Sequence, residues 1–200
     1  MTKKNLPHAA EPIRSKNEIN RVKLRLLEKE NFKFYAIFCV GINTGLRIGD
    51  ILSLKWDQVL KNGEIRDHIK VKQQKTKKVV EVSLKSIKKV LQELKSKNPD
   101  DLYLFQSDHH HAKAIARSKG ENVKAYSKQA VYNVLNEYIE GVEYVSTHTL
   151  RKSYGALAYR SGIPIAYISE RLGHSNVQIT QRYLCITADE TRKAFENFSL

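Results

Sequence analysis

The sequence has few cysteines and no long apolar run. Only two of its 200 residues are cysteines, Cys39 and Cys185, and both stand beside apolar residues. This count fits buried, reduced thiols better than a disulfide framework or a metal site. No apolar run approaches the roughly 20 residues that a membrane-spanning helix needs, and no signal peptide opens the chain. We therefore expect a soluble, cytoplasmic protein without a membrane partner.

Acidic residues are also scarce relative to basic ones. The chain has 35 Lys and Arg against 21 Asp and Glu, which gives a formal net charge of +14 and a pI near 9.7. Such a balance favours polyanionic partners. Nucleic acid is the leading candidate, and an anionic membrane surface is the weaker alternative.

One folded domain accounts for most of the chain. Hydrophobic residues make up 41% of the sequence, which is enough for one sizeable core, so we expect a single domain over residues 15–200. Residues 1–14 contain two lysines and two prolines and show no hydrophobic periodicity. They are predicted to form a flexible basic arm.

Helical spacing of apolar residues dominates the predicted domain. Ser15 and Glu18 have the spacing of a capping box, and residues 34–42 are apolar on most sides, as in a helix at the centre of a core. The same spacing predicts further helices. They cover residues 48–56, 87–94 (capped by Ser83 or Ser86), 131–138, 148–161 (capped by Thr147), 164–172 and 177–184, with a last helix from Thr187 that carries Ala194, Phe195 and Phe198.

The period changes in the middle of the chain. Residues 69–71 and 80–84 alternate between apolar and polar, and the polar stretch 72–78 between them predicts the turn of a β-hairpin. Residues 103–105 fit one more short strand. The stretch 109–125 has no clear period and is expected to form a long surface loop. The fold class is therefore mainly α with a small antiparallel β-hairpin.

Three adjacent histidines, His109–His111, begin the expected loop. Neighbouring positions do not share a helical face, and no cluster of carboxylates or thiolates accompanies these imidazoles. We therefore favour a solvated or DNA-facing loop over a metal site. No cofactor is expected elsewhere in the chain.

Four separated segments carry residue types that suit phosphate chemistry. They are Thr44-Gly45-Leu46-Arg47-Ile48-Gly49-Asp50, Gln74-Lys75-Thr76, His148-Thr149-Leu150-Arg151, and Leu172-Gly173-His174-Ser175 followed by Arg182-Tyr183. In this order and spacing they resemble the catalytic domain of the tyrosine recombinase (phage integrase) family, from about Ser15 to Phe198. The resemblance implies that family's catalytic-domain fold and its reaction. In that reaction DNA strands are cleaved and rejoined at specific sites through a covalent 3′-phosphotyrosine.

Arg47 and Arg151 suit the stabilisation of a phosphodiester under attack. The attack puts extra negative charge on the non-bridging oxygens, and permanently charged guanidinium groups can hold these oxygens bidentately without a metal. Taken singly, each arginine fits a solvated surface position. Their places in the matched segments favour a catalytic function instead.

The resemblance gives roles to three further side chains. His148 matches an acid/base or phosphate-orienting group and, three residues before Arg151, shares its helical face. His174 matches a histidine that hydrogen-bonds the phosphate, and Lys75 matches a hairpin lysine that can protonate the leaving 5′ oxygen. The alternatives are helix-terminal roles for the histidines and simple phosphate contact for the lysines of the turn.

Tyr183 is the expected nucleophile. It stands nine residues after His174, where the family carries its nucleophile, whereas Tyr154, Tyr159 and Tyr167 lie in apolar helices and are expected in the core. A phenol with a pKa of about 10 is mostly neutral at pH 7, so it needs a nearby base and cationic surroundings to attack. The arginines and histidines are expected to supply both.

Two other functions fit parts of the pattern. A repressor with the recombinase fold would bind DNA without cutting it, although a pure binder has no need of Tyr183. A type IB topoisomerase would use similar chemistry to relax a single duplex.

The resemblance also bears on assembly. Family members form tetramers on double-stranded DNA, and the C-terminal segment of one subunit docks on its neighbour. The helix predicted from Thr187 resembles that segment, while packing on its own domain is the alternative. The 200 residues leave no room for the separate N-terminal DNA-clamping domain of larger members. A minimal recombinase and a catalytic fragment are both compatible with this length.

Overall fold

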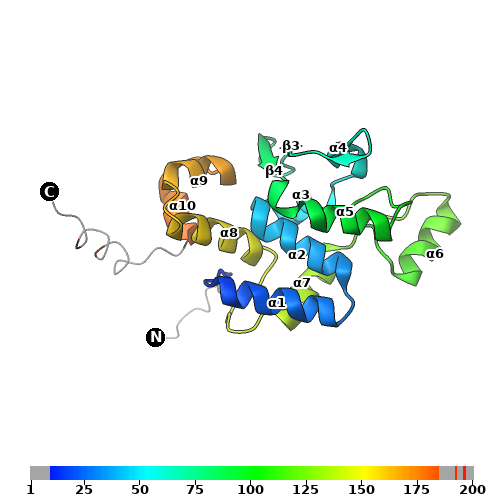
Figure 1. Ribbon diagram of the computed structural model, residues 1–200, viewed down its shortest axis with the longest axis horizontal. Helices are drawn as coiled ribbons and strands as arrows, with labels where there is room; N and C mark the ends of the chain where they lie inside the picture. Colours follow the sequence, from blue (N-terminus) through cyan, green and yellow to red (C-terminus); the bar gives the residue numbers. More distant parts are fainter. Residues whose placement is uncertain (1–9, 185–191, 193–195, 197–200) are drawn as a thin grey trace, which may run out of the picture.

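The computed structural model describes residues 10–184 together with Arg192 and Glu196. The helix predicted from Thr187 with Ala194, Phe195 and Phe198, the thiol of Cys185 and the first nine residues lie outside the described residues. The elements, shown in Figure 1, are α1 (Lys16–Glu28), α2 (Phe32–Thr44), α3 (Ile48–Leu52), α4 (Trp56–Val59), β1 (Leu60–Lys61), β2 (Glu64–Ile65), β3 (His68–Lys72), β4 (Val79–Ser83), a 3-10 turn (Lys85–Ile87), α5 (Lys88–Lys97), α6 (His110–Lys119), α7 (Lys128–Tyr138), α8 (Thr149–Arg160), α9 (Ile165–Leu172) and α10 (Val177–Leu184).

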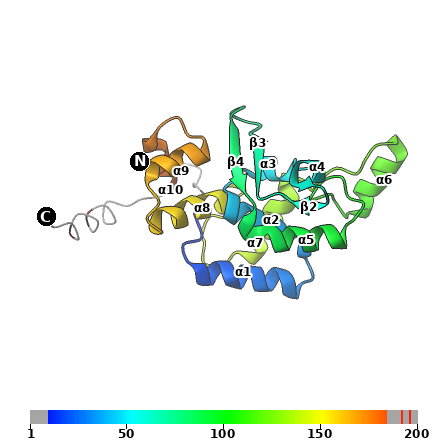
Figure 2. The same cartoon turned by 45° about the horizontal axis from the view of Figure 1, so that its top comes forward.

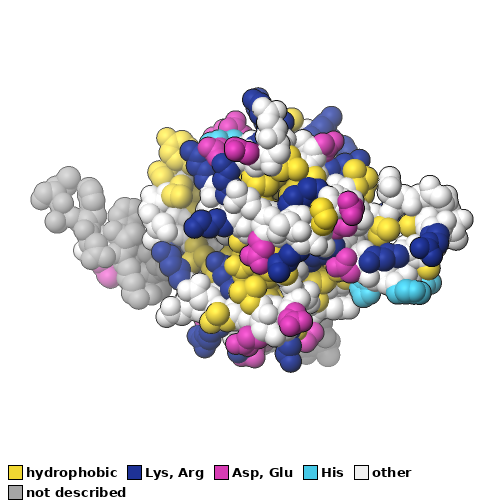
Figure 3. Space-filling model, turned by 45° about the vertical axis from the view of Figure 1, so that its right-hand side comes forward, with side chains coloured by type: hydrophobic (Ala, Val, Ile, Leu, Met, Phe, Trp, Pro, Cys, Tyr) yellow, Lys and Arg dark blue, Asp and Glu magenta, His cyan; other side chains and the backbone are white. Residues whose placement is uncertain are grey.

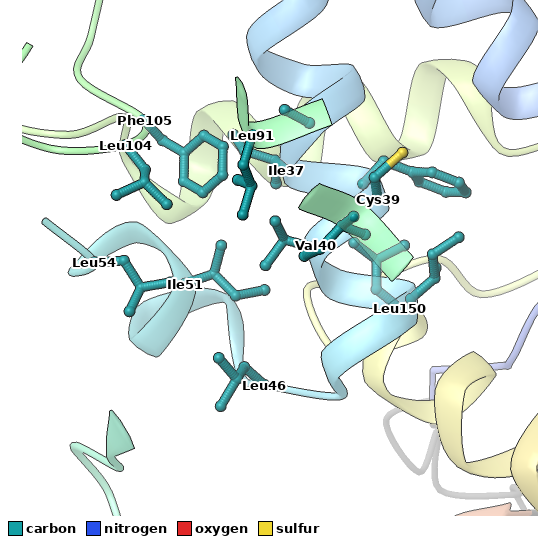
Figure 4. Packing of buried hydrophobic residues seen from close by; sticks show 14 of the residues in the cluster. Ile37, Cys39, Val40, Leu46, Ile51, Leu54, Leu91, Leu104, Phe105 and Leu150 are labelled. Carbon is teal, nitrogen blue, oxygen red and sulfur yellow. The ribbon is translucent and has the colours of Figure 1, made fainter. Parts of the chain in front are cut away.

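A long apolar helix lies at the centre of the fold, as predicted. α2 is buried along most of its length because apolar residues occupy nearly all of its sides. Helices α1, α5 and α8 pack around it. Figure 4 shows Ile37 of α2 directed toward Leu91 and Phe105, and Val40 directed toward Ile51.

The core also includes residues that precede α1. The predicted capping box is confirmed, because the Ser15 hydroxyl accepts from the N–H of Glu18 and the Glu18 carboxylate accepts from the N–H of Ser15. Ile13 is 1% exposed, and its N–H donates to the Ser153 hydroxyl at 2.8 Å. This end of the segment 1–14 is therefore packed against α8, where a flexible arm was expected.

The helix predicted over residues 48–56 is divided into α3 and α4. The carbonyl of Leu54 accepts from the N–H of Leu104, and the N–H of Trp56 donates to the carbonyl of Leu102. Pairing with the segment around Tyr103 therefore takes these backbone groups out of the helix. The same pairing replaces the strand predicted at 103–105 with an isolated bridge.

The expectation of a surface loop over residues 109–125 is wrong. Most of this stretch forms α6, which begins after His109, ends at Gly120 in the left-handed conformation and projects from the body of the molecule (Figure 1). Alanines give this helix high propensity, but Ala116 is its only buried residue, so no large side chain marks a core-facing side. No group of three or more metal-ligating side chains occurs among the described residues.

Two predicted helix caps are also wrong. A 3-10 turn leads into α5, so neither Ser83 nor Ser86 caps it. His148, and not Thr147, occupies the N-cap position of α8, where its side chain makes no capping hydrogen bond. The N–H of Ser146 donates instead to the hydroxyl of Thr149 at 3.0 Å.

The predicted β-hairpin is confirmed. β3 and β4 are antiparallel, from His68 opposite Ser83 to Lys72 opposite Val79. The hairpin stands beside the group of helices α8, α9 and α10 (Figures 1 and 2). None of the described helices is long and apolar enough to cross a membrane.

A second, smaller cluster holds the helices after α8 together. Among the described residues, its fully buried hydrophobic members are Ile168, Leu172 and Leu184. Leu184 packs so closely over Gly155 that a Cβ at that position would lie 2.5 Å from its Cδ2. α10, which carries Tyr183, thus rests on α8 and α9.

Candidate active site

Three of the six predicted site residues border one pocket. Arg47 directly precedes α3, Lys75 lies in the hairpin turn and His148 begins α8, and all three line a pocket of about 170 Å³. Its other lining residues are Ile48, Gly49, Asp50, Gln74, Lys128 and Thr147. We call Arg47, Lys75 and His148 the pocket group.

The other three predicted residues gather around the end of α10. The rings of His174 and Tyr183 lie edge to face, with centroids 5.0 Å apart and an interplanar angle of 74°. Arg151, on α8, is 2% exposed, and its positive charge acts on both rings. We call Arg151, His174 and Tyr183 the tyrosine group.

Arg151 connects two parts of the fold. Its Nη1 donates to the carbonyl of Gly45 at 2.6 Å, and its Nη2 donates to the carbonyl of Leu172. These carbonyls lie at the C-terminal ends of α2 and α9, where the helix dipole favours a cation. Burial lowers the pKa of Arg151, but a guanidinium stays protonated at neutral pH. A buried positive charge is thus fixed beside Tyr183.

Gly45 makes the Arg151 contact possible. Its φ of +66° is left-handed, and a Cβ there would lie 2.4 Å from the Tyr154 ring. The Thr44-Gly45-Leu46-Arg47 segment therefore needs glycine in its second position to turn from α2 to Arg47. This turn places Arg47 at the pocket and directs the carbonyl of Gly45 toward Arg151.

Burial and the nearby positive charges have opposite effects on the pKa of Tyr183. Burial raises the pKa of its hydroxyl to about 12, while the positive charges of Arg151 and Arg47 act to lower it. In addition, Lys152 is 6% exposed, and its ammonium lies over the Tyr183 ring, 5.1 Å from the centroid. Sequence reasoning missed Lys152, because a basic residue next to Arg151 looks like part of a solvated helix face.

Both predicted histidines are neutral at pH 7. Burial, followed by the charges of Arg151 and Arg47, lowers the pKa of His174 to about 4. Its Nδ1 lies 2.9 Å from the hydroxyl of Thr180, a fully buried residue that the sequence did not single out. Partial desolvation and the nearby cations, Arg151 first, also lower the pKa of His148. Each imidazole can therefore accept one hydrogen bond and donate another.

Arg47 links the two groups into one site. Its positive charge lowers the pKa of His148, His174 and Tyr183 alike. Its Nη1 donates to the Oε1 of Gln73 at 2.7 Å. Gln73 is a second side chain that the sequence did not single out, since only its neighbours belong to the matched segment.

The hairpin turn is hydrogen-bonded to the segment that carries Arg47. Asp50 is buried, and its Oδ1 accepts from the N–H of Gln74 at 2.8 Å. The side-chain amide of Gln74 donates to the carbonyl of Gly49 at 3.2 Å. Lys75 is exposed, but its backbone is thereby held next to Arg47.

The three tyrosines that were expected in the core differ in burial. Tyr154 and Tyr159 are partly buried against the small cluster, in line with the expectation of core positions. Tyr167, expected in the core, is 65% exposed. It lies instead at a groove between β4 and α9.

The arrangement suits a bound phosphate. Arg47, Lys75 and Arg151 bring positive charge to one place, beside neutral histidines and a phenol. On the face shown in Figure 3, basic side chains are spread among acidic and apolar ones and do not gather in one patch.

Comparison with known proteins gives a consistent result. The model of the phage integrase family matches residues 15–190. "Probable integrase/recombinase YoeC" of Bacillus subtilis (strain 168) is 36% identical over 194 residues, which cover 96% of this chain and 98% of that protein. "Tyrosine recombinase XerC-like" of Caldanaerobacter subterraneus subsp. tengcongensis is 27% identical over 192 residues, which cover 83% of this chain and 48% of that protein. The chain thus spans nearly all of one relative and about half of the other.

Solved structures share the fold. The crystal structure of XerA recombinase superposes with a TM-score of 0.71 at 22% identity, covering 98% of this chain and 68% of that one. XerH site-specific recombinase bound to its palindromic difH substrate gives a TM-score of 0.69 at 19% identity, covering 98% and 56%. The fold expected from the four matched segments is confirmed.

Proposed function

This chain belongs to the phage integrase family, and on that premise we propose that it is a site-specific DNA recombinase that cleaves and rejoins double-stranded DNA. The observation that carries the proposal is the contact between Tyr183 and His174 beside the buried charge of Arg151. A fixed cation next to a phenol suits stabilisation of a phosphate during nucleophilic attack.

The proposed step is a transfer of the phosphoryl group from a DNA oxygen to Tyr183. The phenolic oxygen forms a bond to phosphorus as the bond from phosphorus to the 5′ oxygen breaks. His148 accepts the phenolic proton, and the ammonium of Lys75 protonates the leaving 5′ oxygen. Attack of a 5′ hydroxyl on the phosphotyrosine reverses each transfer, so strand joining needs neither ATP nor a metal.

The phosphate itself is assigned to the remaining site residues. Arg47 and Arg151 hold the non-bridging oxygens, and His174 donates a hydrogen bond to one of them. The neutral state of His174 at pH 7 supports this role, because its Nδ1 faces Thr180 and the Nε2 is available for a proton. We assign this catalytic domain to residues 15–200 together with the packed segment that contains Ile13, preceded by a basic arm.

We also propose that the protein acts as a tetramer on DNA in the cytoplasm, associated with the nucleoid, and that it moves a mobile element. A crystal structure of a lambda integrase tetramer bound to a Holliday junction shares this fold, with a TM-score of 0.65, which supports the assembly. The segment from Thr187 is assigned to docking on a neighbouring subunit. The formal charge of +14 supports DNA binding that weakens steeply with salt.

A pool of nicked duplexes with randomised central base pairs tests the function. Cleavage near the nick releases a short fragment, so the covalent protein–DNA adduct accumulates and can be isolated on a denaturing gel. We expect an adduct with the wild type and none with Tyr183→Phe. Salt-sensitive binding without an adduct would favour the repressor, whereas an adduct with duplex relaxation but no strand exchange would favour the topoisomerase.

A further inference from the structure

Gln73 is a fully buried polar residue at the base of the hairpin turn. Its exposed fraction is 0%, although the neighbouring Lys72 and Gln74 are exposed. Its backbone closes the turn, since its N–H donates to the carbonyl of Lys78 and its carbonyl accepts from the N–H of Lys77, both at 2.9 Å. Burying an amide is unfavourable unless its hydrogen bonds are replaced, so the partners of this side chain are informative.

The carbonyl oxygen of the Gln73 side chain has two donors. Oε1 accepts from Nη1 of Arg47 at 2.7 Å and from the hydroxyl of Thr76 at 2.7 Å. Thr76 directly follows Lys75 in the turn. One atom therefore connects the arginine of the pocket group with the backbone that carries its lysine.

The same amide fills the space where a side chain would stand in a third segment of the site. A Cβ on Gly173 would lie 3.0 Å from Oε1 and 3.6 Å from Nε2 of Gln73. Gly173 directly precedes His174. Within the described residues the amide nitrogen of Gln73 has no hydrogen-bond partner, so the contacts of its oxygen account for its orientation.

We propose that Gln73 is a positioning residue, which orients the guanidinium of Arg47 and fixes the hairpin turn relative to it. The inference rests on the proposed function, because it concerns how that reaction's arginine is held. The acceptor must also be neutral. A carboxylate in the same place would accept the same hydrogen bonds but would compete with the DNA phosphate for the charge of Arg47.

Two substitutions separate geometry from charge. Gln73→Met keeps the volume and the charge of the site but removes the acceptor. Gln73→Glu keeps the acceptor but adds a negative charge. We expect each to slow adduct formation at saturating DNA by roughly ten- to a hundredfold, because small displacements of catalytic groups have effects of this size.

A neutral substrate distinguishes positioning of Arg47 from a merely structural role. In a duplex with a methylphosphonate at the scissile position, one charged oxygen is replaced by a methyl group, so the reaction depends less on Arg47. The rate loss of Arg47→Met on each duplex shows how strongly the reaction depends on Arg47. The losses of both Gln73 variants should shrink on the neutral duplex in parallel with the loss of Arg47→Met.

Leu94→Ala is the control for folding. Leu94 is a fully buried core residue of α5, so this variant lowers thermal stability and should affect both duplexes equally. The inference would be overturned if the Gln73 variants formed adduct with the ordinary duplex at a rate within about threefold of the wild type. It would also be overturned if their rates fell by the same factor on both duplexes. Absence of an adduct with the wild type would instead overturn the proposed function.

Discussion

The two arginines of the site are held in different ways. Arg151 is 2% exposed and donates to backbone carbonyls at the ends of two helices, whereas Arg47 is half-buried and donates to the side chain of Gln73. The first is part of the scaffold, since losing it would leave buried carbonyls without their donor. The second is held by a polar side chain that can be changed while the helices stay in place.

The hydrophobic support of the two groups also differs. Arg47 stands between Leu46 and Ile48 of the large core cluster, whereas Tyr183 adjoins Leu184 of the small cluster. Among the described residues, that small cluster has only three fully buried hydrophobic members. Regions with few buried apolar contacts open locally at low free energy. The proposed nucleophile, Tyr183, is therefore expected to lie in the less stable part of the site, although Arg151 beside it is the more deeply buried arginine.

Removing the ammonium of Lys75 should cause the largest loss of cleavage rate without changing the fold around the site. Lys75→Ala is expected to slow cleavage by about 10²- to 10⁴-fold, the range for loss of a general acid, because the 5′ oxygen would leave unprotonated. A 5′-bridging phosphorothiolate substrate should restore most of the rate, since a thiolate leaves without a proton. Equal losses on both substrates in single-turnover assays would contradict the role of Lys75 as a proton donor.

Lysine substitutions test the contrast between the arginines directly. Arg47→Lys and Arg151→Lys should each slow adduct formation by about 10²- to 10³-fold, as for loss of an oxyanion donor. Only Arg151→Lys should also lower the free energy of unfolding, by about 1–3 kcal/mol, because a buried carbonyl loses its partner. Urea denaturation measures the second effect. Equal destabilisation by both variants would remove the distinction between scaffold and site.

Hydrogen exchange measures the difference between the two clusters. Amides of α2, in the large core, should exchange only through global unfolding, whereas those of α10 should exchange at least about tenfold faster through local opening. Binding of ordinary duplex DNA should slow the exchange of the α10 amides, because a bound phosphate adds contacts to the tyrosine group. Equal protection of α2 and α10 without DNA would contradict a less stable α10.

Most of the candidate site residues could be proposed from the sequence because each lies in a short local pattern. Arg47, Arg151 and Tyr183 are fixed by motif spacing, and the helices around them follow from apolar periodicity. Gln73, Lys152 and Thr180 could not be predicted, because their partners are distant in sequence or because only burial distinguishes them from solvated residues. α6 was missed for a related reason, since its one buried residue is an alanine, Ala116, and no large apolar residue marks a side that faces the core.

A further expected effect concerns the pH dependence of folding. The pKa of His174 is about 4 in the folded protein against 6.5 ordinarily, so the unfolded chain binds more protons between these values. The free energy of unfolding of the wild type, relative to His174→Gln, should therefore fall as the pH is lowered from 6.5 to about 4, and stay constant above pH 7. Urea titrations at several pH values give this difference. An increase toward acid pH would contradict a histidine held neutral by burial and cations.

The most direct test of the central claim is to identify the residue that is bonded to DNA. Adduct from the nicked duplex is digested with nuclease and trypsin, and the modified peptide is sequenced by mass spectrometry. Cleavage after Arg182 and Arg192 yields the peptide 183–192, which should carry the nucleotide on Tyr183. A nucleotide on another residue, such as the exposed Tyr167, or an undiminished adduct with Tyr183→Phe, would contradict the assignment of Tyr183 as the nucleophile.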